Sequence, residues 1–200
     1  MSAALTNDVF VPKVILSSWR SVVFGCLAFL LLLSTSGEVF ADTFSNEEMV
    51  SLTQKADDLE KAISANDSVQ LAHGIPPKIW NFILDKSNLT DAQLVESIRL
   101  SMQKAAETVT ISSFKTDVEH ATAKQLSDGF RYMLVPTDTY LTIVGAGKVV
   151  VHAQTLAFID SGKWYLVRIS DPQQAAILKL VYPNFKDVEF SKSITENVKE

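Results

Sequence analysis

The sequence predicts an α+β domain in which several helices precede an antiparallel sheet of about four or five strands, and one more helix follows. Three observations support this order. Apolar residues recur every three or four positions up to about residue 107, as they do on one face of a helix. From residue 109 onward the segments are rich in β-branched and aromatic residues. Short turns separate these segments, as in a meander of antiparallel strands.

The first helix is marked by a capping box, because Ser45 is followed three residues later by Glu48. A single apolar stripe follows at helical spacing, formed by Met49, Leu52, Ala56, Leu59 and Ile63. The residues 65–68, "ANDS", are expected to end this helix.

Three shorter helical segments complete this half. The first is expected to run to His73. Pro76 and Pro77 then stand where the start of a helix tolerates proline. Thr90 and Gln93 suggest another capping box, and the helix behind it should bury Val95, Ile98, Met102 and Ala105 before it ends near residue 107.

The strand half consists of five β-rich runs. They cover residues 109–120, 130–137, 139–145, 148–159 and 163–170, and turn residues separate them. Asp171 and Pro172 then indicate the start of a helix over residues 172–181. Residues 191–200 form a polar tail, so the folded domain is expected to span residues 42–190.

The last two runs predict a hairpin with apolar side chains on both faces. A two-residue turn at Ser161 and Gly162 would place Thr155 opposite Arg168. A three-residue turn would shift the pairing by one. We expect one face, with Leu156, Phe158, Tyr165, Val167 and Ile169, to pack on the helices. The helix over residues 172–181 is the simplest cover for the other face, which carries Trp164.

The N-terminal 41 residues have the parts of a secretory signal. Lys13 and Arg20 precede the apolar run of residues 22–33, and small residues follow it, with cleavage expected after Ala41. The alternative is an uncleaved membrane anchor over residues 21–37. Either reading predicts an exported protein, periplasmic or secreted, or held at a membrane by that segment alone.

Composition excludes several classes of function. Cys26 is the only cysteine and precedes the expected cleavage site, so the mature chain would have no disulfide and no cysteine-bound metal. The three histidines are far apart in sequence, and we expect neither a metal nor a cofactor. The formal net charge is −5 and the basic residues are scattered, which argues against a nucleic-acid partner.

The order of helices and strands over residues 44–170, with the closing "DSGKWYLVRI", resembles the NTF2-like (SnoaL-like) superfamily. The resemblance implies a curved sheet wrapped around helices to form a cone, although a C-terminal helix departs from the usual ending on a strand. It also implies a pocket whose mouth carries large rings and polar groups. The candidate ligand-binding residues on this reading are Trp80, Tyr132, Tyr140, Trp164 and Arg168.

Enzymes of this superfamily use Tyr, Asp and His deep in the cone, so Asp117, His120 and Tyr132 are the candidate catalytic residues by residue type. Asp117 and His120 belong to "DVEH", the densest cluster of titratable residues, which we interpret foremost as the solvent-exposed edge of a strand. No family motif matches these residues by position.

Three functions remain as hypotheses. The preferred one is a non-catalytic binding or accessory domain for a small apolar ligand or a protein partner. The second is a proton-transfer isomerase or dehydratase. The third is a structural module that forms a homodimer.

Overall fold

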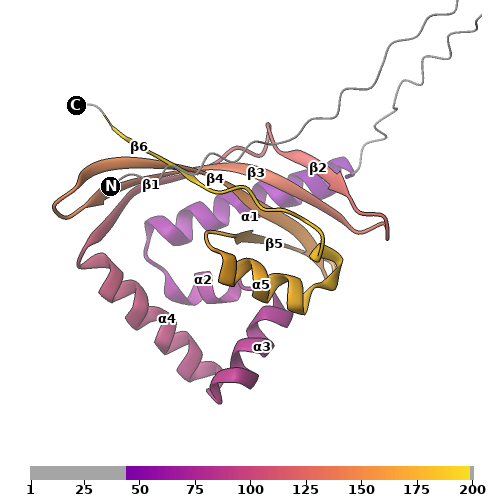
Figure 1. Cartoon of the computed structure of the whole chain (residues 1–200), viewed down its shortest axis with the longest axis horizontal. Helices are drawn as coiled ribbons and strands as arrows, with labels where there is room; N and C mark the ends of the chain where they lie inside the picture. Colours follow the sequence, from indigo (N-terminus) through magenta and orange to yellow (C-terminus); the bar gives the residue numbers. More distant parts are fainter. Residues whose placement is uncertain (1–43, 199–200) are drawn as a thin grey trace, which may run out of the picture. The chain divides into compact units, whose positions relative to one another are not determined.

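The computed structural model describes residues 44–198. The signal or anchor segment predicted within residues 1–41, with Cys26, lies outside the described residues. Figure 1 shows helices at the start of the domain, a curved antiparallel sheet, and a short helix after it, so the predicted α+β class is confirmed. None of the helices within residues 44–198 has both the length and the apolar character needed to cross a membrane.

The four helices of the first half begin and end where local signals place them. Both capping boxes form. The hydroxyl groups of Ser45 and Thr90 accept the backbone N–H groups of Glu48 and Gln93, whose side chains in turn accept the backbone N–H groups of Ser45 and Thr90. Pro77 occupies the first turn of the third helix. The helices are α1 (Asn46–Ser64), α2 (Ser68–His73), α3 (Pro77–Ser87) and α4 (Asp91–Ala106).

Two long strands form the centre of the sheet. β3 (Arg131–Ile143) pairs with β4 (Gly147–Asp160) along its whole length. β1 (Val109–Thr116) and β2 (Thr122–Gln125) share the other edge of β3. β5 (Lys163–Arg168) and β6 (Ile194–Asn197) share the other edge of β4, and all of these pairs are antiparallel.

The strand boundaries differ from those expected in four places, of which the shortened β1 is described below. Residues 130–137 and 139–145, taken as two strands, belong largely to the single strand β3. The short strand β2 was not expected. Part of the polar tail forms β6, whose side chains are all exposed, so backbone pairing with β4 holds it in place rather than burial.

The predicted β1 run is shortened by Pro136 on the neighbouring strand. The Asp117 N–H donates to the Pro136 carbonyl at 2.9 Å, one step beyond the last ladder pair. Proline has no N–H to return this bond, so the ladder stops there. Residues 117–121 therefore form a turn rather than strand.

The β4–β5 hairpin has the register predicted for a two-residue turn. Ser161 and Gly162 both have positive φ, at 51° and 76°, which is the backbone that a type I′ turn requires. Thr155 lies opposite Arg168 and Ile159 opposite Trp164.

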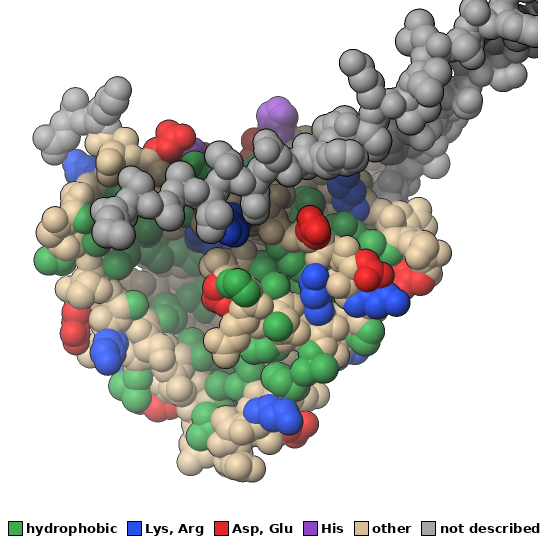
Figure 2. Space-filling view, viewed as in Figure 1, with side chains coloured by type: hydrophobic (Ala, Val, Ile, Leu, Met, Phe, Trp, Pro, Cys, Tyr) green, Lys and Arg blue, Asp and Glu red, His purple; other side chains and the backbone are tan. Residues whose placement is uncertain are grey.

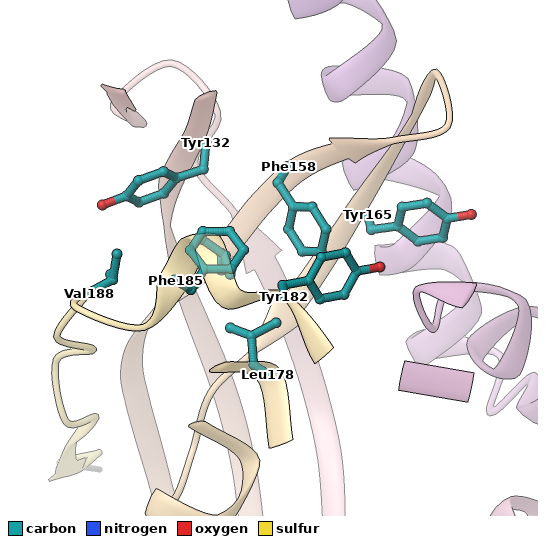
Figure 3. Packing of buried hydrophobic residues seen from close by; sticks show 8 residues of the cluster. Tyr132, Phe158, Tyr165, Leu178, Tyr182, Phe185 and Val188 are labelled. Atoms are coloured by element: carbon teal, nitrogen blue, oxygen red, sulfur yellow. The ribbon is translucent and has the colours of Figure 1, made fainter. Parts of the chain in front are cut away.

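The two faces of the sheet have separate covers. On one face α1 packs its Leu52 against Met133, Val135, Ala157 and Trp164. The Trp164 indole N–H also donates to the Glu48 carbonyl at 2.9 Å. On the other face lie α5 (Pro172–Val181) and the 3₁₀ turn η1 (Pro183–Phe185), with rings packed on Phe158 (Figure 3).

This arrangement differs from the expected one, in which the helices pack on the Phe158 face and the helix over residues 172–181 covers the Trp164 face. α1 instead packs on the Trp164 face, and α5 packs on the Phe158 face, where Ile79 of α3 joins it. The reason lies in the residues just after α5. The rings of Tyr182 and Phe185 are fully buried and meet Phe158 edge-on, at 4.9 and 5.5 Å between centroids. They bring to the Phe158 face an apolar volume that the helix pattern alone does not reveal.

Candidate functional site

A cavity of about 340 Å³ lies beside β5, where helices from the two faces of the sheet approach each other. Its walls are α1, α2 with the segment that joins it to α3, α3 itself, the end of β5, and α5. Figure 2 shows hydrophobic side chains gathered over α3 and α5, on a face that is hollowed between α4 and α5. The apolar lining includes Leu59, Leu71, Ile75, Ile79, Leu166 and Ile177.

The α2–α3 segment shapes one wall of this cavity. α2 ends at Gly74, where a β-carbon would lie 3.2 Å from the Leu71 carbonyl oxygen, so glycine allows a close approach of the backbone. Pro76 is fully buried and precedes the first turn of α3. The segment is thus a packed part of the wall, with Ile75 and Pro76 turned to the cavity.

Arg168 is the cation that β5 brings to the cavity. In the β4–β5 ladder it lies opposite Thr155, and its Nη1 reaches across β4 to donate to Thr139 Oγ1 on β3 at 3.0 Å. Its Nε is buried and has no hydrogen-bond partner among the described residues. Burial lowers the pKa of the guanidinium, because the charged form loses hydration.

A group of three buried threonines lies on the same face of the sheet as Arg168. Thr137 and Thr155 approach each other at 3.2 Å between hydroxyl oxygens, and Thr139 accepts from Arg168. All three are at most 4 % exposed. This small polar stripe gives Arg168 one neutral partner and no negative charge.

Two further charged groups line the cavity from α1. Asp58 Oδ1 accepts from Gln54 Nε2 at 2.9 Å, within the helix. Among the described residues neither Asp58 nor Lys55 forms an ion pair, with Arg168 or with any other group. Two cations and one carboxylate therefore border an otherwise apolar space, which suits a ligand with an apolar body.

Of the five candidate ligand-binding residues, Arg168 alone lines this cavity. The Trp80 indole N–H donates to Asp91 Oδ1 at 2.7 Å and so ties α3 to the start of α4. Trp164 packs on Phe44, with 5.1 Å between ring centroids. Tyr132 is buried beside Phe185, and Tyr140 is 38 % exposed on β3.

The three candidate catalytic residues are not brought together. Asp117 and His120 pair in the turn after β1, with 2.8 Å between Nδ1 and Oδ2, and their side chains are 50 % and 77 % exposed. The Asp117 carboxylate raises the pKa of His120, first through this hydrogen bond and then through its charge. Tyr132 lies in the core on the Phe158 face. None of the three lines the cavity beside β5.

His152, on β4, has a structural partner. His152 Nδ1 lies 2.7 Å from Asp138 Oδ1, directly across the β3–β4 ladder. Within residues 44–198 no three side chains of His, Cys, Asp or Glu lie close enough to hold a metal ion.

Sequence reasoning missed most of this cavity's walls. Apart from Arg168 it singled out aromatic residues, whereas most of the lining is aliphatic and comes from segments far apart in the chain. The one local signal was "HGIPPK", in which a glycine and two prolines mark a tight, stiff connection between helices.

No known family model, curated protein sequence or solved structure matches this chain.

Proposed function

We propose that this protein is an exported, non-catalytic binding domain of NTF2-like type, which holds a small apolar ligand in the cavity beside β5. The observation that carries the proposal is that cavity, whose lining is mostly aliphatic and whose volume is at the lower end of the range for small-molecule sites. Export is proposed from the signal-like sequence of residues 1–41. The NTF2-like assignment is supported by helices placed before a curved antiparallel sheet.

Binding is a better-supported function than proton transfer. A general acid and base must both reach one substrate, directly or through one water. Asp117 and His120 lie in an exposed turn, while Tyr132 is packed among core rings. The cavity itself contains no histidine and one carboxylate, Asp58.

The proposal is tested by blocking the cavity from α3. Ile83 lines it and is only half-buried, so Ile83→Trp adds a large ring to the space without replacing a fully buried residue. Asn81→Trp is the matched control, because Asn81 is exposed on the same helix and does not line the cavity. The protein is purified after expression of the full chain, and binding is followed with an apolar dye such as N-phenylnaphthylamine.

We expect the dye to bind the unmodified protein and the Asn81→Trp variant with equal affinity, and the Ile83→Trp variant at least about tenfold more weakly. Circular dichroism and the melting temperature establish that each variant is folded. Equal dye binding by both tryptophan variants, or no binding by the unmodified protein, would contradict the proposal.

A further inference from the structure

We propose that the ligand of this cavity carries a carboxylate, which pairs with the guanidinium of Arg168 while an aliphatic body fills the rest of the space. This inference rests on the proposed binding function and adds the chemical class of the ligand. It follows from three features of the site: an arginine without a negative partner, a surplus of positive charge, and an aliphatic lining.

The first feature is the set of unused donors on Arg168. A guanidinium has five N–H donors in a planar fork that matches a carboxylate. Within residues 44–198 the structure gives it one hydrogen bond, to the neutral hydroxyl of Thr139, and no carboxylate within ion-pair distance. Arginines removed from water are normally paired, because an unpaired charge loses hydration without compensation.

The contrast with the other arginines is informative. Arg131 on β3 donates from both Nη atoms to the carboxylate of Glu48, at 2.8 and 3.3 Å. Arg99 on α4 forms a similar fork with Glu96, at 2.6 and 2.8 Å. Each described arginine except Arg168 therefore holds a carboxylate of the chain itself. Arg168 is the one that faces a cavity.

The second feature is the net charge of the lining. Lys55 joins Arg168 as a cation, and Asp58 is the one carboxylate. The cavity thus has a net formal charge of +1, although the chain as a whole is at −5. A positive lining in a negatively charged protein favours an anion over a neutral or cationic ligand of the same shape.

The third feature is the aliphatic lining, which decides between kinds of anion. A small hydrated anion such as phosphate would leave the walls formed by Leu59, Ile79 and Ile177 in contact with water. An aliphatic carboxylate covers them with its chain, and each buried CH₂ group adds to the affinity. An amphiphilic monocarboxylate therefore satisfies the guanidinium and the apolar walls together.

The test compares three probes with the same ten-carbon chain and different head groups: decanoate, decanol and decylamine. Binding to the purified protein is measured by isothermal titration calorimetry at neutral pH and low salt. We expect decanoate to bind about tenfold or more tighter than decanol, since a charge-assisted hydrogen bond is the stronger kind, and decylamine to bind most weakly. Inorganic phosphate is expected not to compete with decanoate.

Arg168→Met tests the residue itself, because methionine keeps much of the side chain's length and removes the charge. It should abolish the preference for decanoate over decanol and leave decanol binding within about twofold. Lys163→Met is the matched control on the same strand, since Lys163 is exposed and does not line the cavity. This control should keep the full preference for decanoate.

The outcomes separate this inference from the function on which it rests. Equal binding of decanoate and decanol by the unmodified protein overturns the carboxylate inference and leaves the apolar binding function standing. Binding of none of the three probes overturns both. If Lys55→Met removes the preference and Arg168→Met keeps it, the assignment to Arg168 is wrong. The comparison of head groups uses the unmodified protein, so it can refute the inference even if Arg168→Met fails to fold.

Discussion

Leu178 offers a sharp test of how the C-terminal segment is bound to the sheet. Its side chain is fully buried on α5 and packs in the cluster with Phe158 and Phe185. Leu178→Ala removes three carbon groups, and at about 0.8 kcal/mol each the lost burial is about 2.4 kcal/mol. The void left among rigid rings adds to this, so we expect the free energy of unfolding to fall by about 3–4 kcal/mol.

Leu180 is the matched control, since it lies two residues away on the same helix and is 63 % exposed. Leu180→Ala should change the free energy of unfolding by less than about 0.5 kcal/mol. Urea unfolding followed by circular dichroism gives both values, and the Leu178 variant should also melt about 6–16 °C lower. Equal effects at the two positions would refute the packing of α5 on the Phe158 face, and with it the wall that α5 supplies to the cavity.

Three further predictions concern polar contacts. Glu48→Ala should lower the free energy of unfolding by about 1–2 kcal/mol, because it removes both the helix cap and the ion pair with Arg131. Glu48→Gln should lower it by less in the same urea titrations, because glutamine keeps the cap. Tyr182→Phe should cost about 1–3 kcal/mol in the same assay through the lost 2.6 Å bond to Asp160, and unchanged stability would count against that bond. An NMR titration should find the pKa of His120 above 6.5, and Asp117→Asn should bring it back toward that value. Because the folded pKa is raised, the pair's contribution to stability is present below pH 6.5 and lost as the pH rises through the folded value.

Local signals in the sequence predict the elements well, because each acts within a few residues. The capping boxes at Ser45 and Thr90 form as expected. The turn at Ser161 and Gly162 sets the hairpin register, because positive φ at both positions suits a two-residue turn and excludes a one-residue shift. These features depend on backbone geometry that neighbouring residues determine.

Local signals predict less where a feature depends on contacts between segments that are distant in sequence. The turn at residues 117–121 depends on Pro136, which is distant in sequence and becomes the neighbour of Asp117 only after β1 and β3 pair. The packing of α5 on the Phe158 face depends on Tyr182 and Phe185, which lie outside any helical period. Arg168 is a candidate from the sequence because it lies on the hairpin face that carries Trp164, whereas the aliphatic walls around it carry no sequence pattern of their own.

The position of the cavity follows from the packing of α1 and α5 on opposite faces of the sheet. α1 lies on one face of the sheet and α5 on the other, and the cavity lies between them, beside the edge strand β5. α3 bridges the gap beyond that edge: Ile79 packs against the Phe158 cluster, and Lys78 Nζ lies 4.8 Å from the centroid of the Tyr182 ring. The cavity is enclosed by α1, α3, α5 and the end of β5, and aliphatic side chains form most of its lining.

The guanidinium of Arg168 loses hydration at this edge of the sheet, and no carboxylate among the described residues compensates for that loss. Arg168 ends β5 beside the cavity, and its only hydrogen-bond partner within residues 44–198 is the neutral hydroxyl of Thr139. A leucine or methionine at this position would fit the apolar walls without the loss of hydration. The carboxylate ligand proposed above would pair this half-buried guanidinium, and that pairing would offset its loss of hydration.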